Sequence, residues 1–337
     1  MRATTTFFNA AVRRRMLQVP PIALSILLTL VSCIREAASR ATPPPLPPGQ
    51  GAAVEGKRRG VNFVAGSEIT AADFQPLIAD HVNWIVQTPF GWQTSGSSTE
   101  VRFSGNGGYW GERDQGIEST TLLARRSGIH TLLKPHIWIR GGVWSGEIAM
   151  RSESDWNAWF SSYHDFILHY AQLAQRLGIE ELSIGTELGG TTITRAEDWR
   201  RIIASVRAVY RGKLTYSANW GEFEQVTFWN DLDSISIQAY FPLTKKVRPI
   251  VDDLVTGWAT HLRSIEAVQA RYGKPVQFTE IGYRSAPDAA IEPWQWPKRL
   301  DLSSDPETQA RCYEAFFRVF WKRPWFAGAY FWKWFPH

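Results

Sequence analysis

Two glutamates follow strand-like runs, and their positions suit a reaction that needs a pair of carboxyl groups. Residues 179–190, IEELSIGTELGG, alternate apolar and polar side chains before they reach Glu187 and two glycines. Residues 274–285, KPVQFTEIGYRS, repeat this arrangement and place Glu280 after their own alternating run. On a (β/α)₈ barrel, acids at the carboxyl ends of two strands could cleave a glycosidic bond with retention of configuration.

That reaction needs the two carboxyl groups in different protonation states. One carboxylate attacks the anomeric carbon, and one carboxylic acid protonates the leaving oxygen about 5 to 5.5 Å away. An effective acid has a pKa about two units above that of a free glutamate, a difference of about 2.7 kcal/mol. We expect burial and the charge of Glu280 to raise the pKa of Glu187. The alternative is that both are ordinary strand-end acids in salt bridges.

Strand-like runs alternate with helical windows from residue 59 onward, which is typical of βαβ units and a parallel sheet. The expected strands are the runs before Glu187 and Glu280 and residues 60–65, 82–87, 130–138, 214–220, 234–240 and 327–332. The expected helices are residues 71–80, 118–127, 155–177, 196–210, 251–272 and 306–321. Eight strands predict an α/β fold, the (β/α)₈ TIM barrel, with its active site at the carboxyl face.

The last helix of the barrel is missing from the expected series, because the sequence ends at His337, five residues after Trp332. A bare barrel flank would expose apolar strand surface. We therefore expect part of residues 43–58, or a partner, to cover that side.

Aromatic residues gather in the expected loops. All 17 tryptophans lie beyond residue 80, and the long segment 88–116 contains Trp92, Tyr109 and Trp110. Aromatic rings offer large contact areas with a polar handle, and loops this long are usually functional or disordered. The segment is therefore a candidate binding wall for sugars, although many of the tryptophans are equally explained as core residues.

The first 58 residues differ from the rest. Residues 1–33 combine three consecutive arginines with an apolar run and end in LVSC, which resembles the lipobox of bacterial lipoproteins, with Cys33 as the lipidated residue. A plain secretory signal and a twin-arginine signal are the alternatives. Residues 34–58 are proline-rich and predict an extended tether to the domain at 59–337. The expected location is the bacterial cell envelope, or outside the cell.

Charge and motif content exclude several classes of function. Of 37 basic and 32 acidic residues, six arginines and one glutamate lie in residues 1–40, which leaves 31 of each in the remainder. Without a basic stripe, nucleic-acid binding is disfavoured. The seven histidines show no metal-ligand spacing, and phosphate-loop and dinucleotide motifs are lacking, so neither a metal nor a cofactor is expected. Cys312, the only cysteine besides Cys33, is expected to be a small buried apolar residue.

Five motifs together resemble glycoside hydrolase family 113, a β-mannanase family within the clan of retaining (β/α)₈ glycosidases. They are GTEL at 185–188, SANW at 217–220, QAYFPL at 238–243, TEIGYRS at 279–285 and FWKW at 331–334. The resemblance extends from about residue 59 to residue 336. It implies that Glu187 is the general acid/base and Glu280 the nucleophile. It also implies that Tyr240 hydrogen-bonds the nucleophile and that Trp332 floors the sugar site.

The sequence departs from the wider clan at Thr186, where most members have an asparagine that binds the sugar 2-hydroxyl. Recognition is therefore expected to use Thr186, Asn219 or another donor. Lys134, His136 and Arg284 are candidates for contacts with sugar hydroxyls or with the nucleophile, and structural ion pairs are the alternative. The remaining candidates for substrate binding are Asn62, Trp138 and Trp220.

The sequence and the resemblance together predict a retaining glycoside hydrolase that cleaves β-linked polysaccharide, with β-1,4-mannan as the first candidate and endo-acting mannanases as its closest analogues. One alternative keeps the chemistry and changes the glycan to glucan, galactan or peptidoglycan. Another is a carbohydrate-binding lipoprotein without activity. The expected partners are a polysaccharide or oligosaccharide substrate and a membrane reached only through the lipid anchor.

Overall fold

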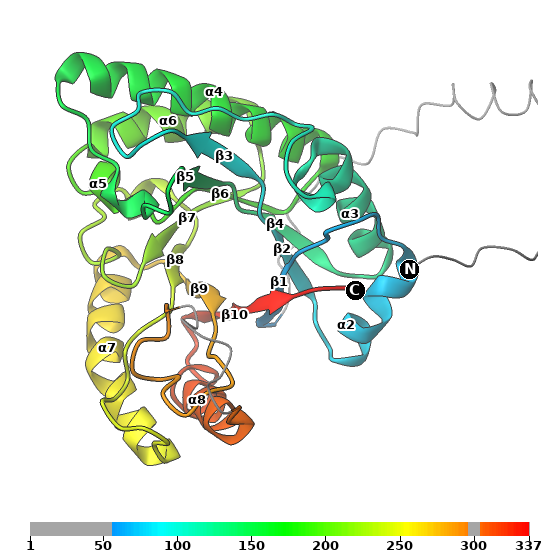
Figure 1. Ribbon diagram of the computed structural model, residues 1–337, viewed down its shortest axis with the longest axis vertical. Helices are drawn as coiled ribbons and strands as arrows, with labels where there is room; N and C mark the ends of the chain where they lie inside the picture. The colour runs from blue at the N-terminus through cyan, green and yellow to red at the C-terminus, as the bar shows by residue number, and fades with distance from the viewer. Residues whose placement is uncertain (1–55, 296–303, 337) are drawn as a thin grey trace, which may run out of the picture. The chain divides into compact units, whose positions relative to one another are not determined.

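The computed structural model describes residues 56–295 and 304–336, and its centre is a closed barrel of parallel strands (Figure 1). Neighbouring strands follow the order β1-β10-β9-β8-β7-β6-β4-β2 around the barrel. These strands are β1 (Arg58–Phe63), β2 (Trp84–Gln87), β4 (His130–Leu133), β6 (Glu181–Thr186), β7 (Lys213–Asn219), β8 (Ile235–Gln238), β9 (Val276–Ile281) and β10 (Phe326–Trp334). The closed ring confirms the predicted TIM barrel.

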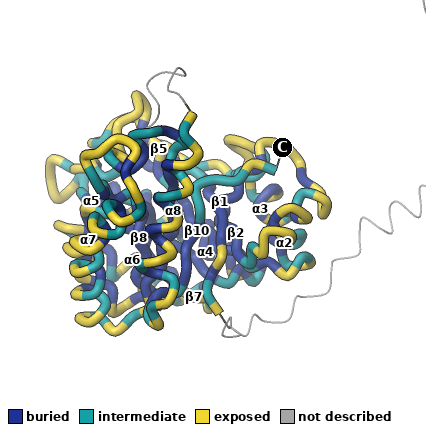
Figure 2. The backbone as a smooth tube through the Cα atoms, turned by 90° about the horizontal axis from the view of Figure 1, so that it is seen from below, coloured by how far each residue is buried: buried dark blue, intermediate teal, exposed yellow. Residues whose placement is uncertain are grey.

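Helices surround the barrel, and the buried strands lie inside them (Figures 1 and 2). The α-helices are α2 (Gln75–Ala79), α3 (Asp114–Arg126), α4 (Glu153–Leu177), α5 (Gly189–Thr192), α6 (Ala196–Val209), α7 (Val251–Tyr272) and α8 (Pro306–Phe320). Single 3₁₀ turns lie at Ala71–Phe74, Trp110–Glu112, Ser145–Glu147 and Trp229–Asp231. Helix α4 shows why these windows fold: Ser152 accepts a hydrogen bond from the Asp155 N–H at its start, and Gly178 takes the left-handed conformation (φ 61°) at its end.

The prediction of one strand over residues 130–138 was wrong. Barrel strand β4 ends at Leu133, and a separate strand, β5 (His136–Ile139), pairs with β3 (Phe90–Gln93) in a two-stranded sheet. Pro89 and Pro135 stand at the two breaks. Because proline has no N–H to donate, the hydrogen-bond ladder of the barrel ends at these residues. Beyond them the two segments continue as the parallel pair β3 and β5 above the barrel mouth.

Part of the barrel interior, between β6, β7, β8 and β9, is polar. Ser183, Ser217 and Thr279 form a hydrogen-bonded chain with oxygen–oxygen distances of 3.0 and 3.1 Å, and Thr279 also donates to Gln238 at 2.9 Å. The apolar residues that alternate with them, such as Leu182, pack in the main hydrophobic core. The alternation that indicated strands therefore marks the face toward the helices.

No helix follows β10 in the part of the chain described, which ends at residue 336. On this side Lys57 donates to the backbone carbonyls of Arg323 (2.9 Å) and Phe326 (2.5 Å) at the start of β10. The rest of the expected cover, residues 43–55, lies outside the described residues. Within those residues no helix is long and apolar enough to cross a membrane.

A buried ion pair closes the amino-terminal end of the barrel and gives the first testable prediction. Arg58 donates to Glu181 and to Gln277, and Glu181 is fully buried. Removing the carboxylate leaves a buried guanidinium unpaired, so we expect Glu181→Ala to lower the free energy of unfolding by about 3–5 kcal/mol. Urea unfolding measures this loss. The exposed Glu224→Ala is the control, with a change within about 0.5 kcal/mol; equal effects of both variants would contradict the assignment.

Candidate active site

Glu187 follows β6 directly and has a left-handed backbone, with φ of 51°. Three contacts hold it there. Its N–H donates to the Ser217 carbonyl at 2.9 Å, its own carbonyl accepts the Ser145 hydroxyl at 3.1 Å, and the next N–H, of Leu188, donates to the Tyr216 hydroxyl at 2.7 Å. A left-handed backbone is uncommon for glutamate and persists only where the surroundings fix it. The position of this carboxyl group is therefore fixed by the backbone.

Both oxygens of the Glu187 carboxyl group accept a hydrogen bond. Asn219 Nδ2 donates to Oε1 at 2.7 Å, and Trp144 Nε1 donates to Oε2 at 3.0 Å. Burial raises the pKa of Glu187, and the charge of Glu280 raises it further, whereas these two donors and the charge of Lys134 oppose the rise. The net upward shift favours the protonated form, which an acid catalyst needs.

Glu280 lies within β9 and is 5% exposed. The Tyr240 hydroxyl donates to Oε2 at 2.8 Å, and the ammonium group of Lys134 donates to Oε1. His136 Nε2 lies 3.7 Å from the same oxygen. These two donors, one on each oxygen, hold the Glu280 carboxyl group in a fixed orientation.

Two neighbours of Glu280 have lowered pKa values. Burial lowers the pKa of Lys134, which is fully buried, and the charge of Glu280 opposes this shift. Burial lowers the pKa of His136 well below its usual range, and the charge of Lys134 lowers it further. The imidazole of His136 is therefore neutral near pH 7. Its buried Nε2 has no hydrogen-bond partner among the described residues.

Trp332 lies on β10 beside these groups. Lys134 Nζ is 5.6 Å from the centre of its ring, and Lys333 Nζ is 4.9 Å away. Since Lys134 also contacts Glu280, the tryptophan and the carboxylate share one ammonium group. The ring is half-buried, which leaves part of it available to a ligand.

The other predicted residues occupy different surroundings. Thr186 is buried and donates to the Pro135 carbonyl at 3.2 Å. Asn62 is fully buried, donates to the Thr279 carbonyl at 3.1 Å, and so has no exposed surface for a sugar. Arg284 makes an ion pair of 3.3 Å with Asp288, in the loop after β9.

Two predicted tryptophans lie in aromatic clusters. Trp220 stacks on Trp294 with ring centres 5.3 Å apart, next in sequence to the Asn219 that contacts Glu187. Trp138, on β5, is half-exposed and lies 6.3 Å from Trp92, ring centre to ring centre. Trp144 was not among the predicted site residues, because its bond to Glu187 spans 43 positions of the chain.

Glu222 is a third carboxyl group, and no motif in the sequence predicts it. It is 2% exposed and accepts hydrogen bonds from the Thr192 hydroxyl (2.5 Å), the Tyr216 hydroxyl (2.6 Å) and the Asn219 N–H (3.1 Å). Burial raises its pKa to about 7, against these three donors. Tyr216 also accepts the Leu188 N–H, and Asn219 also donates to the Glu187 carboxyl group. Glu222 therefore holds two of the residues that position Glu187.

A second prediction concerns the pH dependence of stability. The raised pKa of Glu222 stabilises the fold below about pH 4.5, and this contribution is lost as the pH rises through about 7, a change of about 3 kcal/mol. We expect Glu222→Gln to lack this component. Urea unfolding of both proteins at several pH values from 4.5 to 7.5 measures it; parallel curves over that range would contradict the burial of an ionisable Glu222.

Comparison with known proteins gives a consistent result. A profile of Glycoside Hydrolase Family 113 matches residues 63–337. The chain is similar to the GH113 β-mannanase AaManA from Alicyclobacillus acidocaldarius in complex with ManMIm, with 30% identity, a TM-score of 0.73, and 83% of this chain and 88% of that chain covered. It is also similar to the structure of a GH113 β-1,4-mannanase, with 28% identity, a TM-score of 0.71, and 83% and 89% covered.

More distant structures share the fold alone, such as the β-glucuronidase of Ruminococcus gnavus, with 13% identity, a TM-score of 0.57, and 82% of this chain and 43% of that chain covered. A search of curated proteins gives no match. The profile covers most of the chain, and each of the two solved structures of the same family covers 83% of it. This chain belongs to Glycoside Hydrolase Family 113.

Proposed function

We propose that this protein cleaves β-1,4-linked mannan by a retaining, double-displacement mechanism. The observation that carries the proposal is the asymmetry of the two carboxyl groups at one barrel mouth: Glu187 has a raised pKa, whereas Glu280 accepts bonds from Tyr240 and Lys134. The family members with solved structures that resemble this chain are described as β-mannanases, which supports mannan as the substrate.

In the first half of the reaction, Glu280 attacks the anomeric carbon and Glu187 gives its proton to the leaving oxygen. The bond from the anomeric carbon to the leaving oxygen breaks as the ester bond to Glu280 forms. Tyr240 and Lys134 hold the attacking carboxylate in position, and Trp332 provides an apolar face beside it.

In the second half, Glu187 is a carboxylate and accepts a proton from water. The resulting hydroxide character lets the water oxygen attack the anomeric carbon, and the bond to Glu280 breaks. Asn219 and Trp144 donate to the two oxygens of Glu187 and therefore stabilise the form that acts as a base. Two inversions at one carbon give net retention.

A panel of purified polysaccharides tests the substrate. We expect reducing ends to be released from β-1,4-mannan, and proton NMR of the first products to show the β-anomer. Release from β-glucan, β-galactan or peptidoglycan but not from mannan would keep the chemistry and change the substrate. Initial formation of the α-anomer would contradict the retaining mechanism.

We also propose that Cys33 carries a lipid that anchors the enzyme to the bacterial envelope. The sequence LVSC supports this assignment, and residues 1–55 lie outside the described part of the chain. Metabolic labelling with an alkynyl fatty acid in a bacterial host tests it. We expect label on the parent protein and none on Cys33→Ala; a soluble, unlabelled parent would leave a plain secretory signal as the explanation.

A further inference from the structure

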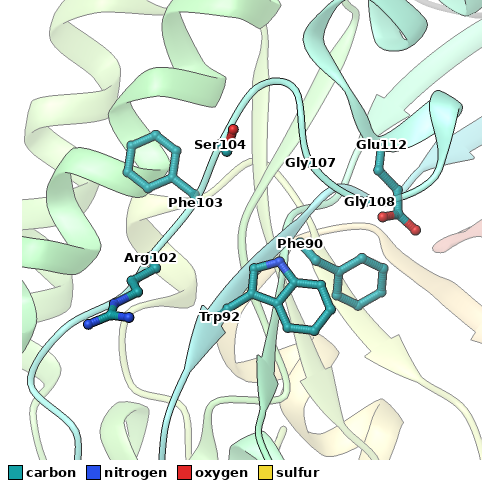
Figure 3. Close-up of a pocket in the computed structure, with 8 residues that line it drawn as sticks. All are labelled: Phe90, Trp92, Arg102, Phe103, Ser104, Gly107, Gly108 and Glu112. Carbon is teal, nitrogen blue, oxygen red and sulfur yellow. The ribbon is translucent and has the colours of Figure 1, made fainter.

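A cavity of about 340 Å³ opens beside β3, and Glu187 and Glu280 are not among the residues that line it. Phe90 and Trp92 line one side of it, and the loop with Gly107 and Gly108 passes over them and leads to Glu112 (Figure 3). The two rings have centres 6.3 Å apart. The cavity therefore combines an aromatic wall with one carboxyl group, the combination that suits a sugar ring and its hydroxyls.

The aromatic wall is held by backbone and side-chain contacts. Trp92 exchanges two backbone hydrogen bonds with Arg102 (2.6 and 2.8 Å), and β3 pairs with β5 along its length. Trp92 and Trp138 pack edge to face, yet they are 45% and 50% exposed. A supported ring that stays half-exposed can stack on a ligand without first being ordered.

The carboxyl group is also fixed. Glu112 Oε2 accepts the Tyr109 N–H at 3.1 Å, and it fills the space where a Cβ at position 108 would stand, 2.0 Å from that point. Gly108 has a φ of 71°, so both its left-handed backbone and the lack of room for a Cβ atom favour glycine at this position. Of the described residues that line the cavity, Arg102 is the cation, and Glu100 pairs with it at 2.7 Å. The lining thus favours a neutral ligand over an acidic one.

Two connections place the cavity on the Glu280 side of the active site. Phe90 packs on His136 with ring centres 5.4 Å apart, and His136 lies 3.7 Å from Glu280. The charges of Glu112 and Glu280 both act on Lys333. Glu187 instead contacts Trp144 and Asn219. Since the leaving group departs past the acid, the cavity lies toward the non-reducing end of the substrate.

We propose that this cavity is a subsite for a neutral hexose unit of the polysaccharide, on the non-reducing side of the unit that reacts at Glu280. Trp92 stacks on the sugar ring, and Glu112 accepts hydrogen bonds from its hydroxyls. The assignment rests on the proposed function, because the direction of the chain follows from the roles of Glu187 and Glu280. It makes the enzyme's efficiency depend on substrate length.

The test compares long and short substrates. We expect Trp92→Ala to lower kcat/KM on mannohexaose about 10- to 100-fold, and to leave kcat/KM on 4-nitrophenyl β-mannoside within about twofold, because the aryl glycoside does not reach the cavity. Trp92→Phe should recover most of the loss. Glu112→Gln should lower the hexasaccharide value about tenfold. The control is Phe317→Ala, an exposed ring on α8, with neither value changed.

Binding separates this proposal from the proposed function. In the inactive Glu280→Gln protein, calorimetry with mannohexaose should show affinity about tenfold weaker or more after the added Trp92→Ala change. If the parent protein cleaves no mannan yet Trp92→Ala weakens hexasaccharide binding, the catalytic proposal fails and the subsite stands. Equal losses on long and short substrates, or unchanged binding of mannohexaose, would overturn the subsite.

Discussion

Glu280→Gln is expected to lower kcat on the cleaved polysaccharide by at least about 10⁴-fold. The amide retains the size of the side chain and can still accept the Tyr240 hydroxyl, but it cannot form the ester with the anomeric carbon. The variant should melt near the temperature of the parent. Initial rates by reducing-end release, with thermal unfolding as the control for folding, measure both quantities.

A smaller side chain gives the complementary result. In Glu280→Gly, azide can occupy the vacated volume and attack the anomeric carbon directly, so activity on an activated aryl glycoside should return with azide and yield the α-glycosyl azide. Hydrolysis by Glu280→Gln within about tenfold of the parent rate would remove Glu280 as the nucleophile.

Glu187→Gln is expected to lower kcat on polysaccharide about 10²- to 10⁴-fold, the range for loss of a general acid and base. The loss depends on the leaving group, because an activated aryl oxide departs without a proton. For such a substrate the covalent intermediate should accumulate, and added azide should restore turnover and yield the β-glycosyl azide.

The pH profile gives an independent measure of Glu187. Its pKa is raised by burial and by the charge of Glu280, and in the proposed mechanism the protonated form is the active acid, so activity should fall as the pH rises through that pKa. We expect this basic limb to disappear in Glu187→Gln when an activated substrate is used. A basic limb that persists unchanged, or equal losses on activated and unactivated substrates, would assign the acid to another group.

The barrel and the two glutamates could be predicted because their signals are local. The prediction for α7, residues 251–272, has the bounds found in the structure, since an amphipathic pattern of that length predicts a helix and not a strand. Glu187 and Glu280 could be placed because apolar side chains toward the helices alternate along both strands. No pattern in the sequence predicted the left-handed backbone of Glu187.

The remaining features depend on contacts between distant residues. The partner of β3 is β5, and neither strand is long enough to stand out from its flanking loops. Glu222 has no motif of its own, and its role follows from Thr192, 30 positions earlier, and from its burial. The hydrogen bonds at the amino-terminal end of the barrel similarly join Arg58 to the distant residues Glu181 and Gln277. Such long-range pairs are specified by the closed barrel and are invisible to local periodicity.

Covalent trapping tests the central assignment most directly. In 2-deoxy-2-fluoro-β-mannosyl fluoride the 2-fluorine slows both steps of a retaining reaction, and the good leaving group keeps the first step fast enough for the glycosyl-enzyme ester to accumulate. Peptide mass spectrometry of the inactivated protein should find one added sugar on the peptide that contains Glu280, and none after Glu280→Gln. Label on any other carboxyl group, or an unlabelled protein that still converts mannan to α-anomeric products, would contradict the account.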